Sequence, residues 1–377
     1  GETQESVPQS GSDRGLESAL DAEQGDVSRD FEEHCGEGEG DDDHEDLDEP
    51  TEVIPFMLDI VTPNQPSRFE LVFYVGSVKY WYQLVLDSKQ IYFEKLSVYH
   101  SIQPTMLFCR ELESDHSVIT FNPNVVKVSQ VIKEKISAEC LKNMSFFAAR
   151  DKVNVSIPGI DEAKEWLKNQ IMQIVVPSTR MFEYAERKIA SDDKLREYLL
   201  SVVYNADFNI SDINTQVIKE NIPQKMLKAI LESDVISEQD KDRLKKERYL
   251  SKPKTDFIHS VNNERGTEQY SMKAEYQSRG TRRIFGLEAA LYEVFHRNGF
   301  LTIDEIEASL HPDLVEFFIS GFLKQKSRSQ LLVSTHYDPL LETIGDLLRK
   351  DSVWFTEKKE SGHTEVYSLV EFSGLNR

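Results

Sequence analysis

The chain has 377 residues, of which 39% are hydrophobic, which is enough for one large domain or two medium ones. Its formal net charge is −22, but nineteen Asp and Glu against two Arg place −17 of that charge in residues 1–50, so the acidity says little about what the rest of the chain binds. No apolar run approaches the ~20 residues of a membrane span, and the polar N-terminus does not fit a signal peptide. The three cysteines lack metal-ligand spacing and are too few for a disulfide framework, which favours a reducing, cytoplasmic location.

Residues 1–50 are rich in Gly, Asp, Glu, Ser and Gln and contain few large apolar residues. Such a composition cannot bury enough surface to offset chain entropy, so we predict an acidic disordered tail, with at most a weak helix from Leu16 to Gln24. The run from Asp41 to Asp46 has the oxygen ligands of a cation site, but a solvated acidic linker is the favoured interpretation.

Residues 51–124 predict an antiparallel β-subdomain. Short runs alternate apolar and polar residues, are rich in aromatics and are separated by turns such as Val75-Gly76-Ser77. The expected strands are 66–75, 78–86, 90–96, 105–110 and 118–121. The aromatic run Tyr80-Trp81-Tyr82 is compatible with base stacking, but packing in the core and between strands is favoured.

Residues 125–254 predict a helical insertion that is a lid or arm rather than a rod, because apolar residues recur every three to four positions without sustained heptads. The expected helices are 125–136, 161–175, 181–189, 193–204 and 237–246, with a turn over 205–212. The dense basic cluster of the chain follows: Arg243, Lys245, Lys246, Arg248, Lys252 and Lys254. A solvated helix end is favoured for it, with contact to a phosphate backbone as the alternative.

Residues 255–377 alternate short strands with helices. The expected strands are 255–261, 268–276, 300–303, 330–334, 353–355 and 364–369. The expected helices are 282–296, 314–323 and 338–349, the last interrupted near 343–345. The segment Ser278-Arg279-Gly280-Thr281 opens the first of these helices. Backbone N–H groups at a helix start favour anions, so this segment is a candidate phosphate contact, with an ordinary serine N-cap as the alternative.

The apolar strand 300–303 delivers two adjacent carboxylates, Asp304 and Glu305, to its C-terminal edge, where open α/β sheets bind ligands. Adjacent strand residues point to opposite sides, so the two carboxylates can have different roles. One can lie near a hard cation through oxygen and water, and the other can accept a proton from an attacking water. The next strand ends in Ser334-Thr335-His336, although His336 alone would be interpreted as a structural histidine.

The order of these motifs, with Ala308-Ser309-Leu310-His311-Pro312 after the carboxylates, resembles the C-terminal lobe of ABC-type ATPases. Within these, the chain is similar to the stand-alone "AAA family" ATP-binding proteins of bacteria and archaea, relatives of RecF and of the structural-maintenance-of-chromosomes (SMC) ATPases. The resemblance covers roughly residues 53–372 and is dense only from Gln277 to Phe372. It implies an α/β fold with an ABC-ATPase-like mixed sheet and flanking helices, an antiparallel β-subdomain and a helical insertion.

The resemblance also implies catalytic roles. Asp304 would be the Walker B carboxylate that holds Mg²⁺, through water, beside ATP. Glu305 would be the catalytic base, and His336 would be the switch histidine that touches the γ-phosphate.

A further implication is that the protein forms a homodimer around two nucleotides. Ser278, Gly280 and Thr281 would form the signature motif, which meets the nucleotide of a partner subunit. The segment 308–311 would be the D-loop at the dimer seam.

A P-loop ATPase also needs Gly-x-x-x-x-Gly-Lys-Ser/Thr, whose amides and lysine hold the β- and γ-phosphates. The sequence contains no such run, and its glycine-rich pieces at 11–18 and 36–40 are acidic and lack lysine. Either the chain is the C-terminal part of a longer ATPase, or it has lost nucleotide chemistry. Asp304, Glu305 and His336 favour the first explanation. Arg279 departs from the family pattern, because many relatives carry a smaller or acidic residue there.

These features predict an ATP-binding and ATP-hydrolysing protein of ABC type with ATP and Mg²⁺ as cofactors, hydrolysis depending on completion by a Walker A loop. The resemblance implies a role in phage defence or DNA maintenance, beside an effector protein such as a nuclease. Contact with DNA is left open and no membrane partner is expected. The alternative is a non-catalytic interaction or regulatory module that keeps the ATPase shape.

Overall fold

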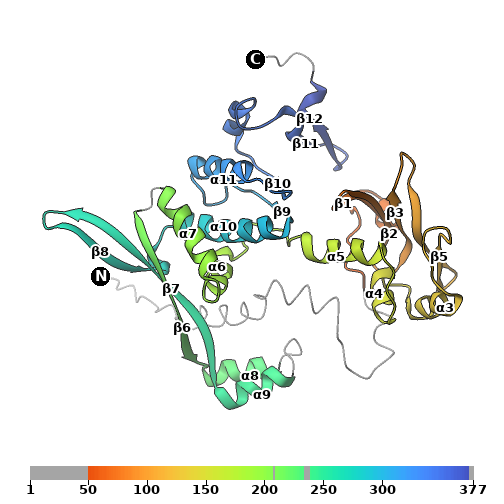
Figure 1. Ribbon diagram of the computed structural model, residues 1–377, viewed down its shortest axis with the longest axis horizontal. Coiled ribbons are helices and arrows are strands. Elements are labelled where there is room, and N and C mark those ends of the chain that lie inside the picture. Colours follow the sequence, from red (N-terminus) through yellow and green to blue (C-terminus); the bar gives the residue numbers. More distant parts are fainter. Residues whose placement is uncertain (1–49, 207–208, 233–237, 373–377) are drawn as a thin grey trace, which may run out of the picture. The chain divides into compact units, whose positions relative to one another are not determined.

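The computed structural model describes residues 50–206, 209–232 and 238–372. The predicted acidic tail and its weak helix lie outside these ranges, except for Pro50. Two compact units make up the described chain, and Figure 1 labels their elements. The sheet unit consists of residues 50–170 and 341–372, and the helix-rich unit consists of residues 171–340. In the described ranges, no helix is long and apolar enough to cross a membrane. The predicted division into four segments stays a prediction.

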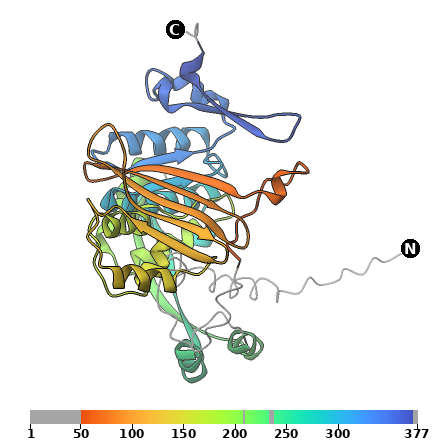
Figure 2. The ribbon, with the colours of Figure 1, turned by 90° about the vertical axis from the view of Figure 1, so that its right-hand side faces the viewer.

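A five-stranded antiparallel sheet, with its strands in chain order, forms the sheet unit (Figure 2). Its strands are β1 (Ser67–Val75), β2 (Val78–Leu86), β3 (Ile91–Tyr99), β4 (Thr105–Glu113) and β5 (His116–Phe121). Val75 pairs with Val78 across a tight hairpin, where Gly76, at φ +61, supplies the left-handed backbone that the turn needs. The predicted meander is confirmed, and β3 and β4 run three residues beyond their predicted ends.

The core of this unit joins the sheet to three helices, α3 (Gln130–Glu139), α4 (Phe146–Asp151) and α5 (Ile160–Gln170). Phe73 and Tyr80 are buried and stack with their ring centroids 5.4 Å apart. Phe108 of β4 and Phe146 of α4 are fully buried and stack at 3.8 Å. Tyr80 is therefore a core residue, as favoured from the sequence.

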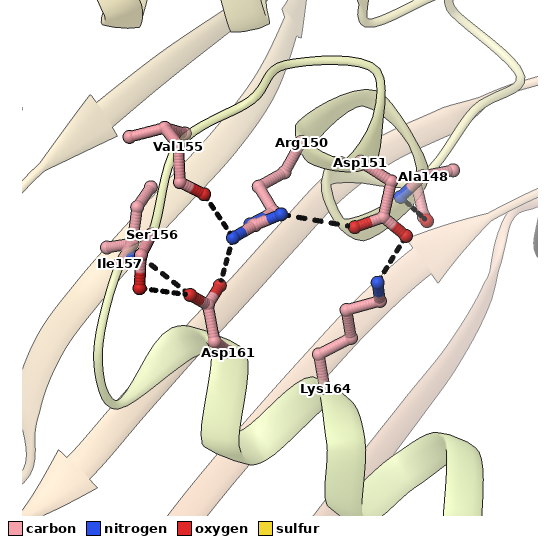
Figure 3. Close-up of polar contacts among 9 residues, drawn as sticks. Ala148, Arg150, Asp151, Val155, Ser156, Ile157, Asp161 and Lys164 are labelled. Atoms are coloured by element: carbon pink, nitrogen blue, oxygen red, sulfur yellow. Dashed lines mark hydrogen bonds and ion pairs between the residues drawn. The ribbon is translucent and has the colours of Figure 1, made fainter.

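Ion pairs and hydrogen bonds link α4 to α5 (Figure 3). Arg150 of α4 lies 2.7 Å from Asp161 of α5, and Lys164 of α5 pairs with Asp151 of α4. Asp161 also accepts the backbone N–H of Ile157, in the loop between the helices, at 2.7 Å. These contacts connect the two helices independently of the apolar core.

The C-terminal part of the sheet unit contains the antiparallel hairpin of β11 (Trp354–Lys358) and β12 (Thr364–Ser368), which confirms the last two predicted strands. Of the helix predicted over 338–349, the interruption near 343–345 is confirmed, whereas an α-helix on either side of it is wrong. The chain instead forms a 3-10 turn over Asp338–Thr343, and Gly345, at φ +97, takes a backbone that cannot continue a helix.

Three helices form the core of the helix-rich unit: α6 (Met181–Ile189), α7 (Asp193–Asn205) and α10 (Arg279–Arg297). They confirm three predicted helices. Helices α6 and α10 cross so closely that a Cβ atom on Gly286 would lie 2.3 Å from the backbone carbon of Met181. The crossing therefore requires glycine in the middle of α10.

A three-stranded antiparallel sheet packs on these helices in the order β6 (Ile210–Asn221), β7 (Tyr249–Asn263), β8 (Gly266–Lys273). Beyond β8, β6 and β7 continue as a two-stranded ribbon, and α8 (Gln224–Glu232) and α9 (Glu238–Glu247) lie at its far end (Figure 1). We call this ribbon with its two helices the arm. The strand pair predicted on either side of residues 262–266 is confirmed as β7 and β8.

The predicted turn over 205–212 is wrong, because β6 begins within it. A bulge shifts the register between Ile210 and Asp212. It breaks the alternation of apolar residues, so that Ile210 and Ile213, three positions apart, are both buried. The segment predicted as a helical insertion therefore contains a long strand besides its helices.

A parallel pair of strands, β9 (Phe300–Ile303) and β10 (Gln330–Val333), is connected by α11 (Pro312–Lys324). The helix predicted to end at 175 ends at Gln170 in α5, because the following run is rich in β-branched residues. Ile171 and Val175 form parallel bridges to β9 on the side away from β10. Together with the antiparallel sheets and flanking helices, this confirms the predicted mixed α/β fold.

Candidate functional site

The candidate site lies at the C-terminal ends of β9 and β10, which are parallel and in register along their whole length. Asp304 and Glu305 follow β9, and the segment Ser334-Thr335-His336 follows β10. All five residues therefore leave the sheet at one edge, the edge at which the sequence predicted Asp304 and Glu305. Asp304, Glu305 and His336 are exposed there.

Ser334 joins the two loops at this edge. Its backbone N–H donates to Ile303 O at 3.0 Å, which extends the pairing of β10 with β9 by one residue. Its hydroxyl donates to the carboxylate of Asp304 and accepts the backbone N–H of Glu305 at 2.9 Å. One side chain thus orients the first carboxylate and fixes the peptide that carries the second.

Glu305 has a left-handed backbone, at φ +47. This conformation costs a residue with a Cβ atom about 1 kcal/mol, and such residues cluster at functional sites. The two carboxylates lie just beyond β9, so the turn sets their directions, and the alternation argued from the sequence does not apply to Glu305.

Glu307 holds the loop of His336 in place. Its carboxylate accepts the backbone N–H of His336 at 2.7 Å. Burial raises the pKa of Glu307, but this hydrogen bond, the neighbouring Thr335 hydroxyl and the nearby His336 outweigh burial and leave the pKa below its usual value. Sequence reasoning missed Glu307 and the hydroxyl of Ser334, although Glu307 lies only two residues after Glu305.

The predicted phosphate contact at 278–281 forms the start of α10. Ser278 is the N-cap, and its hydroxyl accepts the Thr281 N–H at 3.0 Å and lies 2.8 Å from the Thr281 hydroxyl. Gly280 packs against the segment predicted as the D-loop, because a Cβ atom there would lie 3.1 Å from Ser309 O. Ser309, like Glu305, has a positive φ.

The predicted residues thus form two groups. The loops of Asp304, Glu305 and His336 are bonded together through Ser334 and Glu307. In the described part of the chain, no hydrogen bond or ion pair joins Ser278 or Thr281 to any of these three.

The donor set of the first group fits Mg²⁺ together with a nucleotide. No group of three or more His, Cys, Asp and Glu that could hold a metal ion is found in the described ranges. Mg²⁺ does not need one, because it is bound through one or two carboxylates with waters and substrate phosphates. Asp304 offers such a carboxylate at an exposed edge. The hydroxyl of Ser334, which contacts it, is a second oxygen that could act as a metal ligand.

A family model described as "AAA domain, putative AbiEii toxin, Type IV TA system" matches residues 183–342. The "AAA family" ATPase resemblance drawn from the sequence is therefore confirmed, at the level of the fold, over this segment. Both groups of candidate residues lie within the AAA-type segment.

Three solved structures of SMC proteins also show some likeness. The SMC head domain from Thermotoga maritima is 12% identical, over 81% of this chain and 75% of that chain, with a TM-score of 0.34. An SMC head bound to the C-winged helix domain of ScpA is 10% identical, over 76% of this chain and 77% of that chain, with a TM-score of 0.34. A structure described under ATP-driven dimerization and DNA stimulated activation of SMC ATPases is 11% identical, over 49% of this chain and 88% of that chain, with a TM-score of 0.28. TM-scores this low support no conclusion about this chain. No curated protein matches it.

Proposed function

We propose that the protein binds ATP with Mg²⁺ at the C-terminal edge of β9 and β10 and hydrolyses it. The observation that carries this proposal is the bonded arrangement of Asp304, Glu305 and His336 at one sheet edge, held by Ser334 and Glu307. A carboxylate that binds a cation, a second carboxylate that accepts a proton and a histidine that faces the phosphate can together serve phosphoryl transfer to water.

In this proposal each residue has a separate role. Asp304 holds the Mg²⁺ ion, which neutralises phosphate charge when it is bound. Glu305 accepts a proton from the attacking water, while the bond between the γ-phosphorus and the bridging oxygen breaks to give ADP and phosphate. His336 faces the charge that develops on the γ-phosphate.

A homodimer would complete the site. Ser278, Gly280 and Thr281 would meet the nucleotide of the other subunit, with the hydroxyl of Ser278 and the free N–H groups at the start of α10 directed at its phosphates. The sequence has no Gly-x-x-x-x-Gly-Lys-Ser/Thr run, so hydrolysis in this proposal also depends on completion of the site by a Walker A loop.

The matched family's description names a toxin of a type IV toxin–antitoxin system, and this supports a role in phage defence over DNA maintenance. We propose a cytoplasmic protein that acts beside an effector such as a nuclease. If the protein binds DNA, the basic residues of the arm would contact it. Of these, Lys254 forms an ion pair with Glu220 at 3.7 Å, and the ammonium group of Lys219 lies over the ring of Tyr249.

The test is the Glu305→Gln variant, assayed for phosphate release and for ATP binding. The amide cannot accept the proton, so turnover should fall by at least about a hundred-fold while ATP binding persists. The matched control is Glu360→Gln, which changes an exposed acid on the C-terminal hairpin and should hydrolyse ATP as the wild type does. Unchanged turnover in Glu305→Gln would contradict the proposed base. Absence of ATP binding in the wild type would favour the alternative, a non-catalytic interaction module with the ATPase shape.

A further inference from the structure

Gln277 connects the start of α10 to the central strand of the three-stranded sheet. Its amide Nε2 lies 2.6 Å from Nε2 of His259 in β7. The same amide nitrogen lies 3.5 Å from the sulfur of Met272 in β8. Because an amide nitrogen only donates, the ring nitrogen that faces it accepts the hydrogen bond.

His259 belongs to the side of β7 that faces the helices. Thr255, Phe257 and His259 alternate along the strand and therefore share this side. The backbone N–H of Thr255 donates to Glu186 of α6 at 2.7 Å, and Phe257 is fully buried against Phe285 of α10. His259 makes the next contact along the strand. It is only partly buried, so its contact with Gln277 is polar, whereas that of Phe257 is packing.

Strand β7 is continuous from Tyr249, beside the helices of the arm, to Asn263. The strand therefore connects the arm to Thr255 and His259 without a break. The Glu186 contact marks the position where the ribbon joins the three-stranded sheet, since β8 begins to pair with β7 at Asp256.

Gln277 directly precedes Ser278, the N-cap of α10. Its backbone is extended, at φ −72 and ψ 155, and its N–H donates to Ala274 O at 3.0 Å. With the side chain anchored on His259 as well, the direction in which the chain enters Ser278 is fixed at both ends of the residue. The hydrogen bond from the Thr281 N–H to the Ser278 hydroxyl depends on that direction.

We propose that His259 is a positioning residue that acts through Gln277 and couples the arm to the segment Ser278–Thr281. In its free position the arm holds this segment ready for an anionic ligand, and an arm displaced by a partner would release it. The proposal rests on the proposed function only in that the ligand of the segment is the nucleotide phosphate.

Backbone amide exchange of the full chain without nucleotide tests the link itself. His259→Leu and Gln277→Ala remove one hydrogen bond, so amides of residues 278–285 should exchange about five-fold faster. His259→Gln offers a side-chain oxygen as the acceptor and should restore the wild-type rate. His100→Leu, at an exposed histidine of the sheet unit, is the matched control and should leave these amides unchanged. Urea unfolding of each variant establishes that the chain is folded.

Sedimentation of the same variants with ATP and Mg²⁺ tests the functional consequence. Nucleotide-dependent self-association should weaken about five-fold in His259→Leu and recover in His259→Gln. Unchanged exchange over 278–285 in both His259→Leu and Gln277→Ala would overturn the proposal. Faster exchange in a chain whose wild type does not associate with ATP would uphold the link and contradict the proposed function instead.

Discussion

At the scale of single residues, Ser334 orients both candidate catalytic carboxylates, through a hydrogen bond to Asp304 and another from the Glu305 N–H. Ser334→Ala removes both bonds and leaves the Glu305 peptide without its partner. Because one such hydrogen bond contributes about 1 kcal/mol, we expect the affinity for Mg²⁺–ATP to fall about five- to ten-fold. Calorimetric titration measures this affinity, with Ser361→Ala, on an exposed hairpin turn, as the control. An unchanged affinity would mean that Ser334 plays no part in positioning the site.

The sequence allowed Asp304 and Glu305 to be placed at the end of one strand and His336 at the end of the next. That these strands pair in parallel, so that all three residues share one edge, is seen only in the structure. It did not reveal Glu307 as the partner of His336. That bond depends on the left-handed backbone of Glu305, which turns the chain so that Glu307 reaches the next loop. Hydrophobic periodicity contains no information about such a turn.

At the scale of elements, the crossing of α6 and α10 makes an unusual demand at Gly286. Alanine favours a helix interior over glycine by about 1 kcal/mol, but a Cβ atom at Gly286 would overlap the backbone of Met181. We expect Gly286→Ala to destabilise the chain by about 1–3 kcal/mol because the helices must move apart. Gly321→Ala in α11 is the matched control, since nothing lies within 4 Å of its Cβ position, and it should stabilise by up to about 1 kcal/mol. Urea unfolding compares both, and equal stability of the two variants would contradict the crossing geometry.

A second prediction for an element concerns Glu94, which is fully buried in β3 and accepts the Phe146 N–H of α4 at 2.6 Å. Burial raises its pKa to about 7, although hydrogen bonds from Phe146 and Tyr82 and the charge of Arg110 act to lower it. The folded chain therefore retains a proton that the unfolded chain, with the ordinary value of 4.5, releases. Stability should fall as the pH rises from about 4.5 to about 7, by about 3 kcal/mol from this residue alone.

Glu94→Gln has no carboxyl group to titrate at this position. The unfolding free energy of the variant should therefore vary less between pH 5 and pH 7.5 than that of the wild type, by about 3 kcal/mol. Glu113→Gln, an exposed position of β4, is the control and should keep the wild-type dependence. The same pH dependence in Glu94→Gln and the wild type would show that Glu94 ionises normally in the folded chain.

Elements with uninterrupted patterns could be predicted, whereas those shaped by tertiary contacts could not. The meander of β1–β5 and the helices α6, α7 and α10 follow their periodicities. Strand β6 was missed because a bulge interrupts its alternation. Residues 171–175 were assigned to a helix, but β9 offers a neighbouring strand with which they pair.

At the scale of the whole molecule, every candidate residue of the nucleotide site belongs to the helix-rich unit, and so does the arm. The sheet unit, with its own aromatic core, contributes none of them. The family match covers most of the helix-rich unit and ends at residue 342, close to that unit's end at 340. We therefore expect the substitutions that change ATP binding or hydrolysis to lie in residues 171–340.

The most direct test of the proposed function is calorimetric titration of the full chain with ATP in the presence and absence of Mg²⁺. We expect saturable binding that requires Mg²⁺, is lost in Asp304→Asn and is weakened in His336→Ala. Asp313→Asn, an exposed acid at the start of α11, is the control for charge and should bind as the wild type does. Absence of binding, or binding that is the same in Asp304→Asn and the wild type, would contradict a nucleotide site at the edge of β9 and β10.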